Sequence, residues 1–153
     1  MSIEPVRKQI TVAAPQATAF EVFTAGMGGW WNKEHSIGDE PLDTVVIEPR
    51  VGGRWFERGK TGTECEWGAV AAWEPPSRVV LTWQLDADWQ YDPDLRTEVE
   101  VRFTDEGPET TRIDLEHRGL EALGDRAVAL RGVFDGPTGW TGLLQLYTER
   151  VAA

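Results

Sequence analysis

Residues 138–152, TGWTGLLQLYTERVA, decide the fold of this chain. Apolar side chains recur there at Trp140, Leu144, Tyr147 and Val151, with the spacing i, i+4, i+7 and i+11. This is the period of an α-helix with one apolar face. Such a face has to lie against a large apolar surface, and the rest of the chain is rich in strand-like segments that supply one. We therefore expect a curved antiparallel sheet wrapped around this helix, with any function located between the two.

Alternation of apolar and polar residues predicts the strands of that sheet. The segments that read as strands are residues 6–12, 43–51, 54–58, 64–73, 78–85, 96–104 and 111–117. The dipeptide Gly52-Gly53 suits a tight hairpin turn, and Gly68 suits a bulge where a long strand bends. A short helix is expected after Pro15 and an irregular helical stretch at 119–134. This order of elements indicates an α+β fold.

Length and charge restrict the class of protein. The 153 residues carry a formal net charge of −11 and suit a single domain spanning 1–153. A nucleic acid or an anionic membrane surface would repel this charge, so we expect neither as a partner. No apolar run approaches the ~18 residues of a membrane span, and the first residues lack the features of a signal peptide. We therefore expect a cytoplasmic protein.

The sequence shows no pattern of catalytic or metal-binding residues. The only serines are Ser2, Ser36 and Ser77, and none lies in a G-x-S-x-G elbow. Cys65 and the two histidines form no spaced ligand set, so we assign no metal ion and no cofactor. These observations favour a domain without catalytic machinery.

Five charged residues in the predicted strands leave one question open, namely which of them face the concave side of the sheet. They are Glu48, Arg54, Glu57, Glu64 and Glu66. A charge inside an apolar cavity costs several kcal/mol unless it is paired or solvated. Any of the five that points inward would therefore be a candidate for ligand binding or proton handling.

His117 ends an alternating strand in which Ile113 and Leu115 point inward, so its ring is also expected on the inner face. Two interpretations are open. In one, the imidazole hydrogen-bonds a backbone group near the start of the next helix. In the other, it belongs to a pocket, where its titration range suits acid–base chemistry. The connection 86–95, with Trp89, is likewise either a local aromatic cluster or the rim of a cavity.

Eight tryptophans are the compositional oddity, because each joins a large apolar ring to one hydrogen-bond donor. Trp83 and Trp140 are most simply core residues that pack against the helix, whereas several others suit a cavity wall. Large aromatic rings also shrink a cavity, which favours a small or flat ligand. The candidate ligand-binding residues are Phe23, Trp30, Trp31, Trp55, Trp67, Trp73, Trp83, His117, Trp140 and Leu144.

Short motifs follow one another in a fixed order along nearly the whole chain. They include Ala14-Pro15, Trp30-Trp31, PRVGGRWF at 49–56, WEPPSR at 73–78 and His117-x-Gly119. In this order they resemble the SRPBCC (START/Bet v-like) superfamily, and more narrowly its branch of activators of the heat shock protein 90 ATPase. The resemblance implies a helix-grip fold, in which about seven antiparallel strands curve around a long C-terminal helix and two short helices follow the first strand.

The resemblance also implies a function. Members of the superfamily commonly enclose an apolar cavity and bind small hydrophobic molecules, and the branch is named for a stress-response co-chaperone. Our leading hypothesis is a monomer or homodimer that holds a small hydrophobic or aromatic molecule between the sheet and the C-terminal helix. Two alternatives are open: a protein-interaction module with a chaperone partner, and a cyclase- or hydrolase-type enzyme that uses His117 and a pocket acid.

Overall fold

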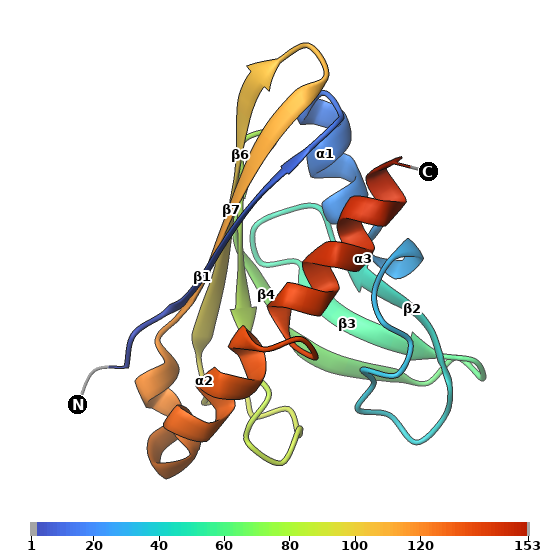
Figure 1. The fold of residues 1–153 in the computed structure, drawn as a ribbon. Helices are drawn as coiled ribbons and strands as arrows, with labels where there is room; N and C mark the ends of the chain where they lie inside the picture. Colours follow the sequence, from blue (N-terminus) through green and yellow to red (C-terminus); the bar gives the residue numbers. More distant parts are fainter. Residues whose placement is uncertain (1–2, 153) are drawn as a thin grey trace.

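The computed structural model describes residues 3–152 and confirms the helix-grip architecture (Figure 1). The strands within these residues are β1 (Val6–Val12), β2 (Leu42–Ile47), β3 (Arg54–Gly59), β4 (Glu64–Glu74), β5 (Arg78–Trp83), β6 (Thr97–Gly107) and β7 (Thr110–Arg118). The helical elements are α1 (Gln16–Phe23), the 3-10 helices η1 (Met27–Gly29) and η2 (Leu120–Arg126), α2 (Ala127–Asp135) and α3 (Trp140–Ala152).

The strands form one antiparallel sheet in the order β1-β7-β6-β5-β4-β3-β2. The first strand lies beside the last, with Val6 opposite His117. From β2 to β7, each strand pairs with the strand that follows it in the chain. The strand predicted at 43–51 ends at Ile47, because the chain turns before β3 and Gly52 takes a φ of +82° there. Figure 1 shows the sheet curving around α1 and α3, which lie on the same side of it.

A bulge bends β4 where the sequence predicted one. Trp55 of β3 pairs with Gly68 and Phe56 pairs with Glu66, so Trp67 is the extra residue between them. A Cβ atom on Gly68 would lie 1.8 Å from the carbonyl oxygen of Thr82 on β5, so only glycine permits this close approach. The bulge therefore sets the position of Trp67, which lines the pocket described below.

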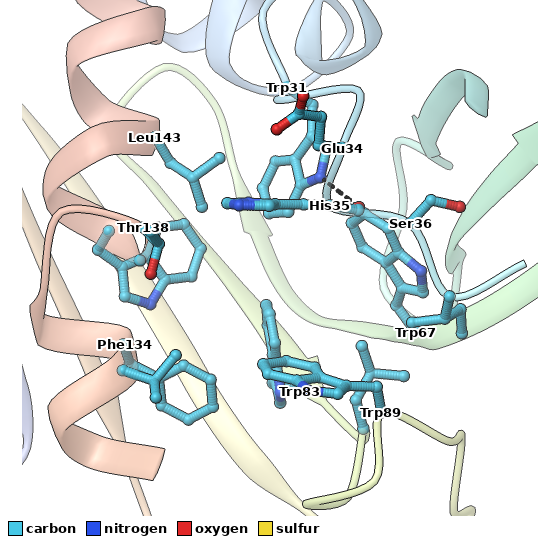
Figure 2. A pocket seen from close by; sticks show the side chains of 15 residues that line it. Trp31, Glu34, His35, Ser36, Trp67, Trp83, Trp89, Phe134, Thr138 and Leu143 are labelled. Carbon is cyan, nitrogen blue, oxygen red and sulfur yellow. Dashed lines mark hydrogen bonds between the residues drawn. The ribbon is translucent and has the colours of Figure 1, made fainter. Parts of the chain in front are cut away.

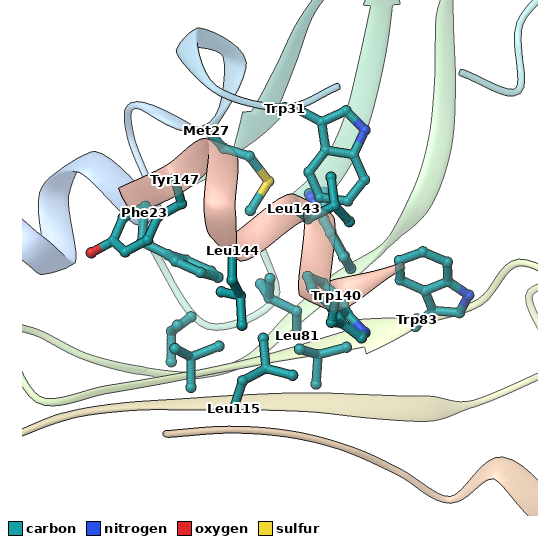
Figure 3. Close-up of a cluster of buried hydrophobic side chains, with 14 of the residues drawn as sticks. Phe23, Met27, Trp31, Leu81, Trp83, Leu115, Trp140, Leu143, Leu144 and Tyr147 are labelled. Carbon is teal, nitrogen blue, oxygen red and sulfur yellow. The ribbon is translucent and has the colours of Figure 1, made fainter. Parts of the chain in front are cut away.

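The apolar face of α3 packs on the inner face of the sheet, as its periodicity predicted. Trp140, Leu143, Leu144 and Tyr147 are buried, and Figure 3 shows them among side chains from the sheet and from α1. The hydroxyl of Tyr147 donates a hydrogen bond to the Ala19 carbonyl at 2.7 Å, which ties α3 to α1. The C-terminal helix is thus held between the sheet and the first helix.

Two further findings concern residues 3–152 only. No helix in this range is long and apolar enough to cross a membrane. The range also contains no group of three or more histidine, cysteine, aspartate or glutamate side chains arranged to hold a metal ion.

Candidate ligand-binding site

A pocket of about 350 Å³ lies between the sheet, the helices α2 and α3, and the loop 32–41 (Figure 2). Its volume is in the range of small-molecule sites in proteins. Most of its walls are apolar, and its charged or polar side chains come from the loop apart from Thr138. The lining residues are Trp31, Glu34, His35, Ser36, Ile37, Trp67, Trp83, Leu85, Trp89, Val133, Phe134, Thr138, Gly139, Trp140 and Leu143.

The aromatic rings of the pocket form a continuous wall. Trp31 lies with its ring centroid 4.9 Å from that of Trp67 and 6.2 Å from that of Trp140. Trp83 continues the wall, at 6.0 Å from Trp140 and 5.4 Å from Phe134. These tilted and edge-to-face arrangements are the favourable ones for aromatic pairs, so each ring helps to fix its neighbour. The pocket therefore offers a firm apolar surface to a flat molecule.

Glu57 on β3 is a buried carboxylate, 1% exposed, that fixes the loop side of the pocket. Its Oε1 accepts hydrogen bonds from the indole N–H of Trp67 at 3.0 Å and from the backbone N–H of Ile37 at 2.7 Å. Its Oε2 accepts from the Ser36 hydroxyl at 2.5 Å and from the Gly38 N–H at 3.3 Å. Four donors offset the cost of burying a carboxylate, and they join β4 to the loop.

The other four of the five charged candidates in the predicted strands lie at the surface or are half-buried. Arg54 pairs with Glu64 at 2.9 Å and with Glu66, both on the neighbouring strand β4. Glu48 accepts a hydrogen bond from the backbone N–H of Arg54 at 2.8 Å. Of the five candidates, Glu57 is therefore the one that is buried, and its role is to hold the loop.

His117 is fully buried behind the pocket wall and does not line the pocket. Its Nδ1 accepts the indole N–H of Trp140 at 3.1 Å, and its Nε2 lies 2.9 Å from the Thr97 hydroxyl oxygen. An indole can only donate, so this network assigns the proton of the ring to Nε2, which donates to Thr97. The Thr97 hydroxyl then donates to the Trp83 carbonyl at 2.9 Å.

Burial lowers the pKa of His117 to about 3, so the ring is neutral at physiological pH. Its hydrogen-bond partners are side chains of α3 and β6, not the backbone group that one interpretation expected. The other interpretation placed His117 in a pocket, and it does not describe this position either, because the ring lies behind the pocket wall. His117 instead locks Trp140, which is a wall residue.

Four of the ten predicted ligand-binding residues line the pocket, namely Trp31, Trp67, Trp83 and Trp140. Phe23 and Trp30 lie instead in the core between α1 and α3, with ring centroids 5.2 Å and 5.4 Å from that of Tyr147. The sheet curves far enough for α1 to close over this part of the inner face. These inward aromatic residues therefore face a filled core and not the pocket.

The remaining predicted residues support the pocket or lie away from it. Trp55 packs behind the wall, with its ring centroid 5.4 Å from that of Trp67 and 5.7 Å from that of Trp83. Leu144 is one of the buried residues of α3 and does not line the pocket. Trp73 lies in a different hollow between α1 and β2, where its ring meets that of Phe20 at 5.1 Å.

The structure adds residues that the sequence did not single out as ligand contacts. His35 and Glu34 line the pocket from a loop without regular periodicity, so no pattern in the sequence indicated their direction.

Trp89 supports the rim interpretation of the connection 86–95: it lines the pocket, is 41% exposed and has a φ of +60°. Positive φ is uncommon for a residue with a side chain. The Trp89 ring meets that of Phe134 at 6.2 Å.

A curved antiparallel sheet that grips a C-terminal helix beside an apolar pocket defines a helix-grip protein of the SRPBCC superfamily. The chain belongs to the family described as Activator of Hsp90 ATPase homolog 1-like protein, whose family model matches residues 13–145. This confirms the family that the motifs resemble.

Three solved structures show how far the likeness extends. The anthrahydroquino-gamma-pyrone synthase Txn09 is 37% identical over 97% of each chain, with a TM-score of 0.68. CalC, a self-sacrificing resistance protein from Micromonospora echinospora, is 30% identical over 97% of this chain and 94% of its own, with a TM-score of 0.73. An HSP90 activator from Plasmodium falciparum is 16% identical over 76% of this chain and 73% of its own, at a TM-score of 0.54, and shares the fold. The comparison with curated proteins gave no match.

Proposed function

We propose that this chain binds a flat polycyclic aromatic molecule in the pocket beside α3. The observation that carries the proposal is the wall of Trp31, Trp67, Trp83, Trp140 and Phe134 around a space of about 350 Å³. Fused aromatic rings make stacked or edge-to-face contacts with such side chains and bury most of their surface there. A long flexible chain would lose more conformational freedom in the same space.

The likeness to Txn09 supports this class of ligand. The name of that protein describes a synthase of an anthrahydroquino-gamma-pyrone, which is a fused aromatic compound, and its likeness to this chain extends over nearly the whole of both. We transfer the general class of molecule and not the particular compound.

Intrinsic fluorescence tests the proposal, because five of the eight tryptophans line the pocket. Titration with anthraquinone should quench the emission in a saturable way, and titration with oleate should not. The variant W89A removes an exposed ring from the pocket rim and should weaken anthraquinone binding by about tenfold, the equivalent of one aromatic contact. The matched control W73A changes a tryptophan in the other hollow and should leave the affinity unchanged.

The proposal fails if anthraquinone causes no saturable quenching up to its solubility limit. Equal affinity for oleate would also contradict it, since the pocket would then select only for apolar character.

A second candidate function is catalysis of the cyclase type, which the 37% sequence identity with the synthase Txn09 favours. The titratable side chains in the pocket are Glu34 and His35, so we assign any such chemistry to them and not to His117. Turnover of a candidate substrate should then be lost in H35F and kept in H117Q, once the rates are corrected for the folded fraction. The opposite pattern would return the role to His117.

Three expectations from the sequence stay predictions. They are a chaperone partner, which the family name supports, the monomeric or homodimeric state, and the cytoplasmic location.

A further inference from the structure

The backbone of His35 is held in place while its side chain is left free. Its carbonyl accepts a hydrogen bond from the indole N–H of Trp31 at 3.1 Å, and its N–H donates to the Asn32 carbonyl at 2.9 Å. The imidazole makes no hydrogen bond to any side chain or backbone group in residues 3–152, yet it lines the pocket. Figure 2 shows it extending from the loop toward the side of the pocket where Leu143 lies.

The loop that carries His35 is fixed from the other side as well. The three residues that follow it, Ser36 to Gly38, each donate a hydrogen bond to the buried carboxylate of Glu57. The Ser36 hydroxyl is therefore engaged, which leaves two polar side chains of the loop available to a ligand, the His35 imidazole and the Glu34 carboxylate. The backbone from which the imidazole extends is fixed before a ligand arrives, as a recognition group requires.

The surroundings of His35 define the ligand group that suits it. Partial burial lowers the pKa of the His35 imidazole, so the ring is neutral near pH 7 and has a nitrogen lone pair free. The Glu34 carboxylate acts in the opposite direction and favours the protonated ring. A ligand carboxylate is disfavoured, because it would already be charged and would approach the Glu34 carboxylate. A phenolic hydroxyl enters the pocket neutral, and the imidazolium that forms when it gives its proton to His35 offsets the charge of the phenolate.

We propose that His35 takes the proton of a phenolic hydroxyl on the bound aromatic molecule, so that the pocket selects hydroxylated polycyclic aromatics and holds them as phenolates. In this step the phenol O–H bond breaks and an imidazole N–H bond forms, with no other reactant. The resulting imidazolium is stabilised by the charge of the Glu34 carboxylate as well as by the phenolate, and the negative charge of the phenolate spreads over the fused rings. This inference rests on the proposed function, which supplies the aromatic ligand.

Two probes separate the inference from the function on which it rests. Anthraquinone carries the fused rings alone, and 2-hydroxyanthraquinone adds one phenol whose ionisation moves its absorption to longer wavelength. At a pH where free 2-hydroxyanthraquinone is neutral, the wild-type protein should bind it at least about tenfold more tightly than anthraquinone and should produce the long-wavelength band.

Two variants of His35 separate proton transfer from hydrogen bonding. H35F keeps a ring of similar size but no proton acceptor, so it should bind the two probes with equal affinity and should not produce the long-wavelength band. H35Q can accept a hydrogen bond but not a proton, so it should keep part of the preference for 2-hydroxyanthraquinone and lose the band.

The outcomes are distinct. Binding of both probes to the wild type without the band, or a band that persists in H35F, overturns the inference and leaves the proposed function standing. Quenching by neither probe overturns the proposed function and this inference with it.

Discussion

Replacement of Glu57 should destabilise the protein by an amount that follows from its four hydrogen bonds. In E57A the Trp67 indole N–H loses its partner inside the core, while the donors of Ser36, Ile37 and Gly38 regain water only as their loop moves away. Each buried donor without a partner costs about 1–3 kcal/mol. We expect a loss of roughly 3–5 kcal/mol, because the loop donors recover part of their cost from water.

E57Q should cost much less than E57A. With its amide oxygen in the place of Oε1, glutamine still accepts from Trp67 and Ile37, and its NH₂ group can donate to the Ser36 hydroxyl. The bond from Gly38 and the strength that the charge adds are lost, which we put at about 1–2 kcal/mol. The variant should therefore keep the shape of the pocket and bind anthraquinone nearly as well as the wild type.

Urea unfolding followed by circular dichroism measures these differences, and thermal unfolding should show a fall of roughly 10 °C for E57A. E64Q is the matched control, because Glu64 is a partly exposed glutamate on the adjacent strand, paired with Arg54 and Arg58. Such surface pairs contribute at most about 1 kcal/mol. If E57A proves as stable as E64Q, the carboxylate does not hold the loop as described.

Three further substitutions test the core around the site. In the wild type, the His117 ring takes up a proton near pH 6.5 when the chain is unfolded and only near pH 3 when it is folded, so the free energy of unfolding should fall by about 2 kcal/mol between pH 7 and pH 5. H117Q has no such ring and should lack this fall. Urea midpoints across that range check this, and an unchanged slope in the variant would exclude the buried neutral ring. G68A should cost about 3 kcal/mol or more in urea unfolding, because its Cβ would meet the Thr82 carbonyl oxygen at 1.8 Å; wild-type stability would contradict the bulge. Y147F removes one buried hydrogen bond and should cost about 1 kcal/mol without changing anthraquinone affinity; a change in affinity would place Tyr147 in the site.

The fold was predictable because its main signals are local. The helical period of residues 140–151 and the alternation at 96–104 and 111–117 report directly on which faces are buried. The position of Gly68 predicted the bulge, because a glycine within a strand indicates a close backbone approach. Strand ends were less certain, as the early end of β2 at Ile47 shows, since a turn depends on backbone angles that alternation does not report.

The site was predictable only in part, because alternation tells which residues point inward but not how the interior is divided. Trp30 and Trp67 both point inward, yet α1 and α3 enclose the first and leave the second facing a pocket. Glu57 and His35 depend on how the loop 32–41 folds over β3, and this contact joins segments about 20 residues apart in the chain. No periodic signal marks such a contact.

The indole N–H resonances of the eight tryptophans test the central claim of a pocket beside α3 most directly. In a ¹H–¹⁵N spectrum of the labelled protein, anthraquinone should shift the five signals from the pocket wall much more than the three from elsewhere. The five are Trp31, Trp67, Trp83, Trp89 and Trp140, and the three are Trp30, Trp55 and Trp73. Single tryptophan-to-phenylalanine variants assign each signal. Shifts centred on Trp30 or Trp73, or none at all at saturating anthraquinone, would contradict a ligand site between the sheet and the C-terminal helix.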